Sequence, residues 1–335
     1  MNIREISCLM GLWGENFIEA RTMRDVYQVT TDQGKRCLKE VTGYVDRVLF
    51  MTEALNYVYS HGFTRFARCL PSLQGNMVEE HQGRFFIVQE WLEGEEPDYR
   101  NSAHMILAAE TIALFHRAST GFVPATSKVK NKLGKWPQKL EKKYQELKVF
   151  LDTARGTESP SSFEKVLLKY GKWLHKRGRE SIKRIKKSKY RKLANEAAHK
   201  GVLVHGDTAA RNFILKDNII YLIDFDSIAI DINIADLWRL FRRVLRRDQW
   251  DINLANNMLE AYNLYTPLKA EHREVLLAFL YFPEKPWRII KEYYTKKDGP
   301  GWNESSLTER LQEYCSQKEK IDRFLRDFQK TLKSK

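Results

Sequence analysis

The stretch Leu203–Leu215, LVHGDTAARNFIL, places an acid and an amide between two short apolar segments. Val202–Val204 is typical of a short strand and runs directly into His-Gly-Asp. Asp207 is followed five residues later by Asn212, and then a second apolar run begins. Because an unpartnered carboxylate or amide is costly to bury, these two side chains predict a function at the ends of the strands rather than a place in the core.

A second apolar strand, IIYLIDF, ends around Asp224, seventeen residues after Asp207. The turn KDN before it predicts a hairpin, whose mouth would bring Asn212 and Asp224 close together. Amide and carboxylate oxygens are the hard ligands that Mg²⁺ takes, and Mg²⁺ shares its coordination with phosphates. Asp207 would be free on the preceding loop to accept a hydroxyl proton. Asp207, Asn212 and Asp224 together are typical of phosphoryl transfer, in which the enzyme positions the reacting groups and neutralises the charge of the phosphates.

Phosphoryl transfer needs two more groups upstream. Lys39, on the strand RCLKEV, is placed to reach the α- and β-phosphates of a nucleotide. Glu53 lies on the helix expected over Val45–Ser60, and it could pair with Lys39 and hold it in position. A single Lys on a strand or Glu on a helix is more often a surface charge. Their order and spacing relative to the downstream residues favour the functional interpretation.

The motifs HGDTAARNFIL and YLIDFD resemble the catalytic and metal-binding loops of the aminoglycoside phosphotransferase and choline kinase superfamily, a small-molecule branch of the protein-kinase-like fold. The resemblance extends through RCLKEV, FFIVQEWLEGEE, IALFH and DINIADLWRL, and so covers nearly the whole chain. In its length, its Lys- and Tyr-rich insert and its C-terminal helices, the chain is most similar to bacterial spore coat proteins of the CotS and CotI type.

This resemblance implies an α+β, protein-kinase-like fold with two lobes. We expect a nucleotide-binding lobe over residues 1–92, with a small antiparallel sheet and one helix. Hairpin turns at TDQGK and at Gln82-Gly83 are consistent with that sheet. The segment EGEEPD is the expected hinge, and a larger, mainly helical lobe follows over 93–335, with a helical insert at about 128–198. Ser102 is expected to cap the first helix of that lobe.

The resemblance also implies the cofactors ATP and Mg²⁺ and a role for each residue of the site. The implied residues are the catalytic base Asp207, the Mg²⁺ ligands Asn212 and Asp224, the phosphate-binding Lys39 with its partner Glu53, and, through their backbone, the adenine-binding Gln89, Glu90, Trp91 and Leu92. His205 would pack the catalytic loop, and Asp236 would anchor that loop from the next helix. Asp226 recurs near the metal in many members, with or without direct contact.

One segment departs from the superfamily pattern. Backbone N–H groups approach a phosphate only where side chains are absent, yet the segment Arg21–Asp25, expected over the phosphates, contains neither Gly nor Ser. Arg21 or Arg24 could replace the backbone donors with charge. Alternatively, the pocket no longer holds ATP well, and the kinase fold serves as a structural part of the spore coat. The intact polar set at the strand ends favours the first interpretation.

Charge is concentrated in one segment of the chain. The net charge is +14, and Lys165–Lys192 alone contains thirteen Lys or Arg residues and one acid, Glu180. Such a run is usually a solvated helix face, but it could also bind an acidic partner protein or a polyanion. Its aromatic residues fall mostly on or near the apolar face, which argues against nucleic-acid binding as the main role.

The remaining features exclude several classes of protein. The four cysteines show no CxxC spacing and are expected to be free thiols, and neither a secretory signal nor an apolar run long enough to cross a membrane is present. The resemblance implies synthesis in the mother-cell cytoplasm and residence in the spore coat beside other coat proteins. The acceptor, expected to be a small molecule, cannot be identified from the sequence.

Overall fold

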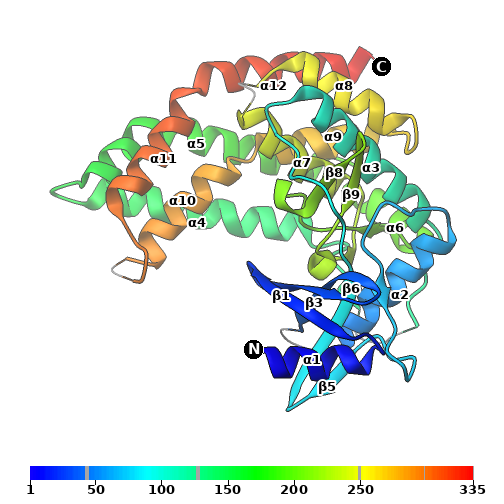
Figure 1. Ribbon diagram of the computed structural model, residues 1–335. Helices are drawn as coiled ribbons and strands as arrows, with labels where there is room; N and C mark the ends of the chain where they lie inside the picture. Colours follow the sequence, from blue (N-terminus) through cyan, green and yellow to red (C-terminus); the bar gives the residue numbers. More distant parts are fainter. Residues whose placement is uncertain (42–44, 126–128, 248–249, 298, 335) are drawn as a thin grey trace.

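The computed structural model describes residues 1–41, 45–125, 129–247, 250–297 and 299–334. Lys128, where we expect the helical insert to begin, and the C-terminal Lys335 lie outside the described residues. Figure 1 shows two unequal parts, a sheet with the N-terminus beside it and a larger helical part that ends in the C-terminal helix. The predicted two-lobe, kinase-like fold is confirmed.

The smaller lobe is built on one antiparallel sheet with strand order β1-β2-β3-β6-β4, and β5 pairs with β6. Its elements are α1 (Ile3–Leu12), β1 (Phe17–Met23), β2 (Val26–Thr31), β3 (Gly34–Glu40), α2 (Val45–Ser60), β4 (Cys69–Leu70), β5 (Glu79–His81) and β6 (Arg84–Glu90). Helix α1 is not predicted above. Its signal is a capping box, in which Asn2 and Glu5 each accept the other's backbone N–H. The lobe therefore holds two helices rather than one.

The larger lobe is mainly helical and carries two small two-stranded sheets. Its elements are α3 (Ser102–Ser119), α4 (Trp136–Gly156), α5 (Ser162–Lys187), α6 (Tyr190–Lys200), β7 (Leu203–Val204), β8 (Phe213–Lys216), β9 (Ile219–Leu222), β10 (Ala229–Ile230), α7 (Ile234–Arg247), α8 (Ile252–Asn263), α9 (Ala270–Tyr281), α10 (Glu284–Thr295), α11 (Glu304–Ser316) and α12 (Lys318–Ser334). The cap of α3 is Asn101, not Ser102, because the Asn101 side chain accepts from the backbone of Ala103 at 3.0 Å.

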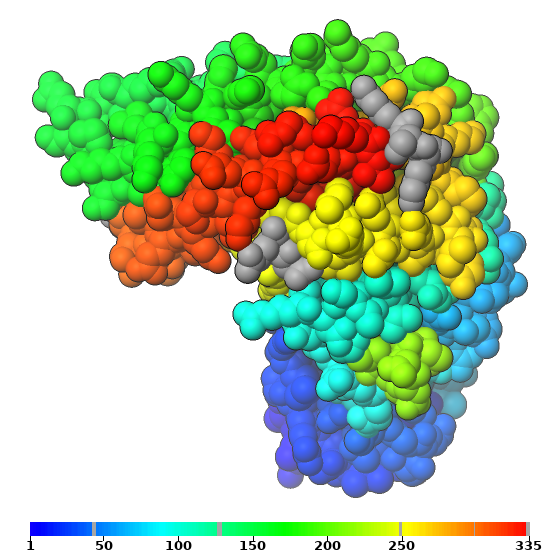
Figure 2. Space-filling view, turned by 90° about the horizontal axis from the view of Figure 1, so that it is seen from above, coloured from blue at the N-terminus to red at the C-terminus, as the bar shows by residue number. Residues whose placement is uncertain are grey.

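Helices α4, α5, α10 and α11 form an arm that projects from the rest of the molecule (Figures 1 and 2). Two glycines of α5 let α4 approach closely. A Cβ at Gly178 would lie 2.7 Å from the Tyr144 ring, and one at Gly171 would lie 2.8 Å from the Leu151 side chain. Both distances are shorter than ordinary contacts, so a larger residue at either position would have to displace the facing side chain of α4.

The hairpin β8–β9 is bonded to two segments outside its own sheet. On one side, Glu95 and Leu215 exchange two backbone hydrogen bonds, of 3.0 and 2.8 Å. On the other, the Leu222 amide donates to the Arg65 carbonyl at 2.9 Å. Gly94 makes the first contact possible, because its φ is +148° and a Cβ there would lie 2.5 Å from the Leu215 carbonyl oxygen. The hairpin is thus fastened both to the segment after β6 and to the segment after α2.

Candidate active site

Asp207 lies on the loop between β7 and β8, where its carboxylate is half-buried and faces two arginines. Arg243 Nη2 donates to one oxygen at 2.6 Å, and Arg211 Nη2 donates to the other at 3.3 Å. Burial would raise the pKa of Asp207, but the hydrogen bond and charge of Arg243, with the charge of Arg211, outweigh it and hold the pKa below its usual value. Asp207 is therefore ionised near neutral pH and able to accept a proton.

The catalytic loop is fixed by two buried side chains. His205 Nε2 donates to the Ile223 carbonyl at 3.0 Å, while its Nδ1 accepts from the Asp207 backbone at 3.3 Å. Asp236, at the start of α7, accepts from the backbone N–H groups of His205 at 2.6 Å and Gly206 at 2.9 Å. Arg239 Nη1 also donates to Asp236, at 3.2 Å. Both residues thus take the supporting positions that the sequence analysis assigns to them.

Asp236→Asn is expected to lower the free energy of unfolding at pH 7 by about 3–5 kcal/mol, the usual effect of breaking a buried charged network. Burial alone would raise the pKa of Asp236, but the hydrogen bond from His116 and the charge of Arg239 lower it well below the usual value. The ionised Asp236 therefore stabilises the fold above about pH 4, and this stabilisation is lost as the pH falls toward the folded-state pKa. Urea unfolding of the unmodified protein and of Asp236→Asn, measured at several pH values, should show that the difference between their free energies of unfolding becomes smaller below about pH 4.

The matched control is Asp152→Asn, which breaks an exposed ion pair with Arg155. This change is expected to lower stability by less than about 1 kcal/mol at every pH. Equal, small losses in the two variants would show that Asp236 does not anchor the loop.

Asn212 and Asp224 meet at the open end of the β8–β9 hairpin, as the hairpin prediction requires. Phe213 pairs with Leu222, and the next residue, Ile223, donates its amide to the Asn212 carbonyl at 3.0 Å. The Asn212 side chain is buried and donates to the Asp207 carbonyl at 2.9 Å, which ties it to the catalytic loop. Asp224 has a left-handed backbone, with φ +61°, a conformation that Asp tolerates better than most residues.

Lys39 of β3 reaches across to the metal-binding loop. Its Nζ lies 2.9 Å from Asp224 Oδ1 and 2.7 Å from Asp226 Oδ1. Burial would lower the pKa of Lys39, but these two carboxylates, Asp226 first, raise it above its usual value. Lys39 is therefore a firmly charged group at the point where the two lobes face each other.

The expected pairing of Lys39 with Glu53 is not among the contacts of the described residues. Glu53 Oε1 instead accepts from the backbone of Ala125 at 2.6 Å, and its buried Oε2 has no hydrogen-bond partner among the described residues. The position of α2 relative to β3 directs the Glu53 side chain toward the segment after α3. The two aspartates after β9 occupy the place beside Lys39 that we assign to Glu53.

The segment expected to meet adenine begins inside the sheet. Gln89 and Glu90 end β6; Gln89 faces Cys37 of β3 and Cys69 of β4, and the Glu90 amide donates to the Arg68 carbonyl at 2.9 Å. Trp91 and Leu92 lie beyond the end of this ladder. In the predicted segment, the backbone groups of Trp91 and Leu92 are therefore the ones that do not take part in strand pairing.

The Gly-free segment Arg21–Asp25 forms the end of the β1–β2 hairpin rather than a wide loop. Met23 pairs with Val26, and Arg24 takes a left-handed backbone with φ +57° in the two-residue turn between them. Arg24 Nη2 lies 3.4 Å from Glu96 Oε2, in an exposed pair of the kind that adds little stability. The tip of the hairpin thus contacts the segment that leads into the helical lobe.

Three cations at the site are not identified by the sequence analysis: Arg211, described above, Arg243 and Lys130. Arg243, on α7, contacts Asp207 directly, and Lys130 Nζ donates to the Asp226 carbonyl at 3.3 Å. The available signal is the run RLFRRVLRR after Asp236, which repeats arginine at helical spacing. Which arginine faces the catalytic loop depends on how α7 packs, and periodicity alone does not fix that.

Residues 17–275 match the model of a protein family described as the phosphotransferase enzyme family. The chain is 27% identical over 304 residues to spore coat protein S of Bacillus subtilis (strain 168), covering 90% of this chain and 86% of that protein. An aminoglycoside phosphotransferase from Alicyclobacillus acidocaldarius has a similar structure, with a TM-score of 0.86, 22% identity and coverage of 95% of this chain and 93% of its own. A spectinomycin phosphotransferase in complex with ADP and spectinomycin has a TM-score of 0.65 at 14% identity, covering 97% of this chain and 98% of its own.

In the part of the chain that the structure describes, no helix is both long and apolar enough to cross a bilayer.

Proposed function

The chain belongs to the phosphotransferase enzyme family, and on this premise we propose that it transfers the γ-phosphoryl group of ATP to a hydroxyl of a small molecule. The convergence of the catalytic and metal-binding loops carries this proposal. Asp207, Asn212 and Asp224 lie on neighbouring loops tied by the Asn212–Asp207 and Asn212–Ile223 hydrogen bonds, and Lys39 reaches Asp224 from the other lobe. These residue types in this arrangement suit a reaction that depends on positioning and charge.

Each residue has a distinct part in the proposed reaction. Asp207, ionised and half-buried, accepts the proton of the acceptor hydroxyl. Lys39, whose Nζ lies 2.9 Å from Asp224 Oδ1 and 2.7 Å from Asp226 Oδ1, exchanges these bonds for bonds to nucleotide phosphates. Trp91 and Leu92 present their backbone to the base of the nucleotide. The ADP in the spectinomycin phosphotransferase complex supports nucleotide use by this fold.

The residues at the hairpin mouth fit Mg²⁺. Asn212 and Asp224 offer an amide oxygen and a carboxylate, both hard donors. Among the described residues, no group of three or more His, Cys, Asp or Glu side chains could hold a metal ion. Two protein ligands leave most positions to phosphate oxygens and water, which is how Mg²⁺ usually binds with nucleotides. When bound, Mg²⁺ neutralises charge on the phosphates.

The second candidate is a kinase fold retained as a structural component of the spore coat, with little or no catalysis. Two observations favour it: the similarity to spore coat protein S, and the β1–β2 turn, which has no Gly or Ser to let backbone donors approach a phosphate. In either case we propose synthesis in the mother-cell cytoplasm and assembly with other coat proteins.

Nucleotide binding separates the two candidates. Thermal unfolding is measured with and without ATP and Mg²⁺, and an enzyme is expected to be stabilised by both together. At a nucleotide concentration one hundred times the Kd, the stabilisation would be about 2.7 kcal/mol. No shift at millimolar ATP and Mg²⁺ would leave the structural role as the better account.

We also propose that the basic face of α5 binds an acidic protein surface or a polyanion. Several charges of Lys165–Lys192 are already neutralised within the chain, since Lys186 pairs with Glu141 at 2.8 Å and Arg184 with Glu180 at 2.8 Å. Lys183 and Lys187 are exposed and have no acidic partner among the described residues. They line a groove between α5, α9 and α12 together with Lys269 and Arg273 and with two acids, Glu180 and Glu274. This groove, rather than the whole segment, is the better candidate for docking.

The double variant Lys183→Gln/Lys187→Gln is expected to elute from heparin at clearly lower salt than the unmodified protein, because it loses two unpaired charges. The interaction should weaken as the Debye length falls from about 10 Å at 0.1 M to about 3 Å at 1 M salt. Lys186→Gln, which removes a charge already paired with Glu141, should shift elution much less. Identical elution of all three proteins would leave α5 as a merely solvated face.

A further inference from the structure

The C-terminal half of α7 carries an unusual density of arginine next to the catalytic loop. Its apolar side is buried in the core, and its other sides present Arg239, Arg242, Arg243, Arg246 and Arg247. Arg243 contacts the carboxylate of Asp207 at 2.6 Å. Arg247 lies 4.6 Å from the ring of Tyr99, whose hydroxyl donates to the Thr208 carbonyl at 2.7 Å. The arginine run therefore begins at the place where an acceptor hydroxyl would have to lie.

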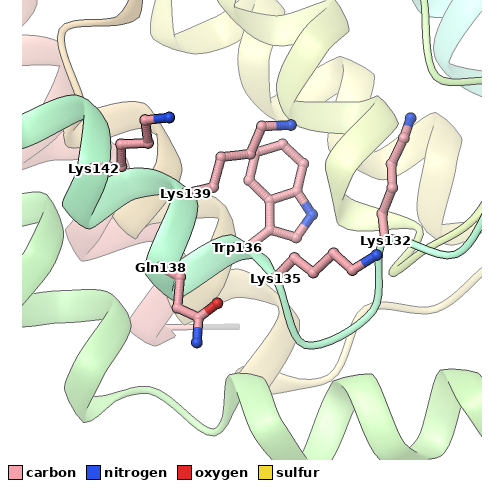
Figure 3. Close-up of a pocket in the computed structure, with 6 residues that line it drawn as sticks. All are labelled: Lys132, Lys135, Trp136, Gln138, Lys139 and Lys142. Carbon is pink, nitrogen blue, oxygen red and sulfur yellow. The ribbon is translucent and has the colours of Figure 1, made fainter.

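The run continues toward a cavity at the start of α4. Arg239 lies one helical turn before Arg243, so their side chains are neighbours on α7. The Arg239 guanidinium is 5.5 Å from the ring of Trp136, which lines the cavity. The cavity has a volume of about 350 Å³ and is lined by Lys132, Lys135, Trp136, Gln138, Lys139 and Lys142. Figure 3 shows Lys132 and Lys139 on either side of the Trp136 ring.

The same cavity is connected to the metal-binding loop. Ile230, in the strand that follows this loop, donates its amide to the Lys130 carbonyl at 2.9 Å and accepts from the Lys132 amide at 2.9 Å. The Lys130 side chain contacts the Asp226 carbonyl at 3.3 Å. Lys130 thus lies beside the metal-binding loop, and Lys132, two residues later, lines the cavity.

The positive charge around this cavity is not balanced by nearby acids. In the described chain, Lys132, Lys139 and Lys142 form no ion pair or hydrogen bond with a carboxylate. The acids around the cavity are already engaged: both Asp231 oxygens accept from Trp136 Nε1 at 3.0 Å, Asp236 anchors the catalytic loop, and Glu284 pairs with Lys143 at 2.7 Å. Burial, with the charges of Arg239 and Lys130, lowers the pKa of Lys132 to about 8. An anion in the cavity would relieve this repulsion, and a cation would add to it.

We propose that the phosphoryl acceptor is an anionic alcohol, a hydroxyl compound that already carries a phosphate or carboxylate group, held by Lys132, Lys139 and Lys142 of the cavity and by Arg239 beside it. This proposal rests on the proposed function. The hydroxyl lies at Asp207 and the anionic group in the cavity. The acceptor oxygen forms a bond to the γ-phosphorus as the bond from that phosphorus to the β–γ bridging oxygen breaks, and the hydroxyl proton passes to Asp207. The products are ADP and a phosphate ester. A cavity of about 350 Å³ suits a small ligand of this class.

The first test measures anion binding without any nucleotide. Calorimetry with pyrophosphate as the probe compares the unmodified protein with Lys132→Ala/Lys139→Ala and with a control, Lys165→Ala/Lys172→Ala, which removes two exposed lysines of α5. The cavity variant is expected to bind at least about tenfold more weakly, because each charge-assisted contact contributes about that factor. The control should be unchanged. Equal affinities in all three proteins, or no binding in any, would overturn the proposal.

The second test measures transfer, as ADP release with Mg²⁺-ATP, from three hydroxyl compounds that differ mainly in charge: glucose, glucosamine and glucose 6-phosphate. A three-carbon set, glycerol, serinol and glycerol 3-phosphate, repeats the comparison. The anionic members are expected to give at least about tenfold higher kcat/KM than the others, and Lys132→Ala/Lys139→Ala should remove this preference. Preference for the amines or neutral alcohols, or a preference that survives the two substitutions, would overturn the proposal.

The two tests separate this inference from the function on which it rests. If the protein binds pyrophosphate through Lys132 and Lys139 but does not bind ATP, the proposed function is wrong and the anion site is confirmed. A protein that phosphorylates only amino alcohols keeps the proposed function, and the anionic acceptor is then wrong.

Discussion

Asp207→Asn is expected to lower the rate of phosphoryl transfer by roughly 10²–10⁴-fold while leaving nucleotide binding unchanged, the usual effect of removing a general base. Asn has nearly the shape of Asp and can still accept a hydrogen bond from Arg243, which contacts Asp207 at 2.6 Å. It cannot accept the hydroxyl proton. The groups that meet the nucleotide, Lys39 and the Trp91–Leu92 backbone, are untouched, so the loss should fall on turnover alone.

Single-turnover ADP release and calorimetric titration with ADP would measure the two effects separately. Asp217→Asn is the matched control, since Asp217 is an exposed acid in the turn at the far end of the same hairpin. It should behave like the unmodified protein. A parallel loss of nucleotide affinity and turnover in Asp207→Asn would contradict the assignment of Asp207 as the base.

Asp224→Asn is expected to abolish Mg²⁺-dependent transfer and the additional thermal stabilisation that Mg²⁺ gives to the protein with ADP. The substitution removes the only carboxylate at the proposed Mg²⁺ site and replaces it with a neutral amide, a far weaker ligand for a hard cation. It also removes one of the two carboxylates beside Lys39, at 2.9 Å. Mg²⁺ titration of the melting temperature in the presence of ADP gives a readout that does not depend on turnover.

Asp226→Asn is the comparison that separates the two consequences. Asp226 lies 2.7 Å from the same lysine and carries the same charge, but its side chain is more exposed than that of Asp224. If Asp224 acts through the metal, only Asp224→Asn should lose the Mg²⁺-dependent shift. Loss of the shift in both variants to the same degree would assign the effect to the charge around Lys39 instead.

The parts of the site that are local in sequence were predictable. A two-strand hairpin with an Asp-Asn turn fixes its own register, so the adjacency of Asn212 and Asp224 follows from periodicity and turn chemistry. Such contacts join residues that are close in sequence, so few backbone conformations of the intervening turn are compatible with them. The place of Asp236 near the start of α7 is implied by the resemblance to the superfamily rather than by spacing.

The contacts between elements distant in sequence were not predictable in the same way. Whether Lys39 meets Glu53 or Asp226 depends on the placement of α2 and of the metal-binding loop against β3, and sequence spacing leaves that open. Arg243 is one of five arginines on α7, and only packing decides which one reaches Asp207. Helix α1 differs from these contacts, because its signal, the Asn2–Glu5 capping box, is local and readable in the sequence.

The hydrogen bonds that hold the β8–β9 hairpin, to Arg65 of the smaller lobe and to Glu95 of the expected hinge, provide an internal measure of motion at these two contacts. The amides of Glu95, Leu215 and Leu222 are held by bonds of 2.8–3.0 Å to partners outside the hairpin's own ladder. The hydrogens of these amides can exchange with solvent only when these hydrogen bonds break. Exchange of the amides inside α3 or the main sheet requires more extensive unfolding. The exchange rates of these three amides would therefore measure how often the molecule opens. Because the same hairpin carries Asn212 and Asp224, each opening would displace the proposed Mg²⁺ ligands as well.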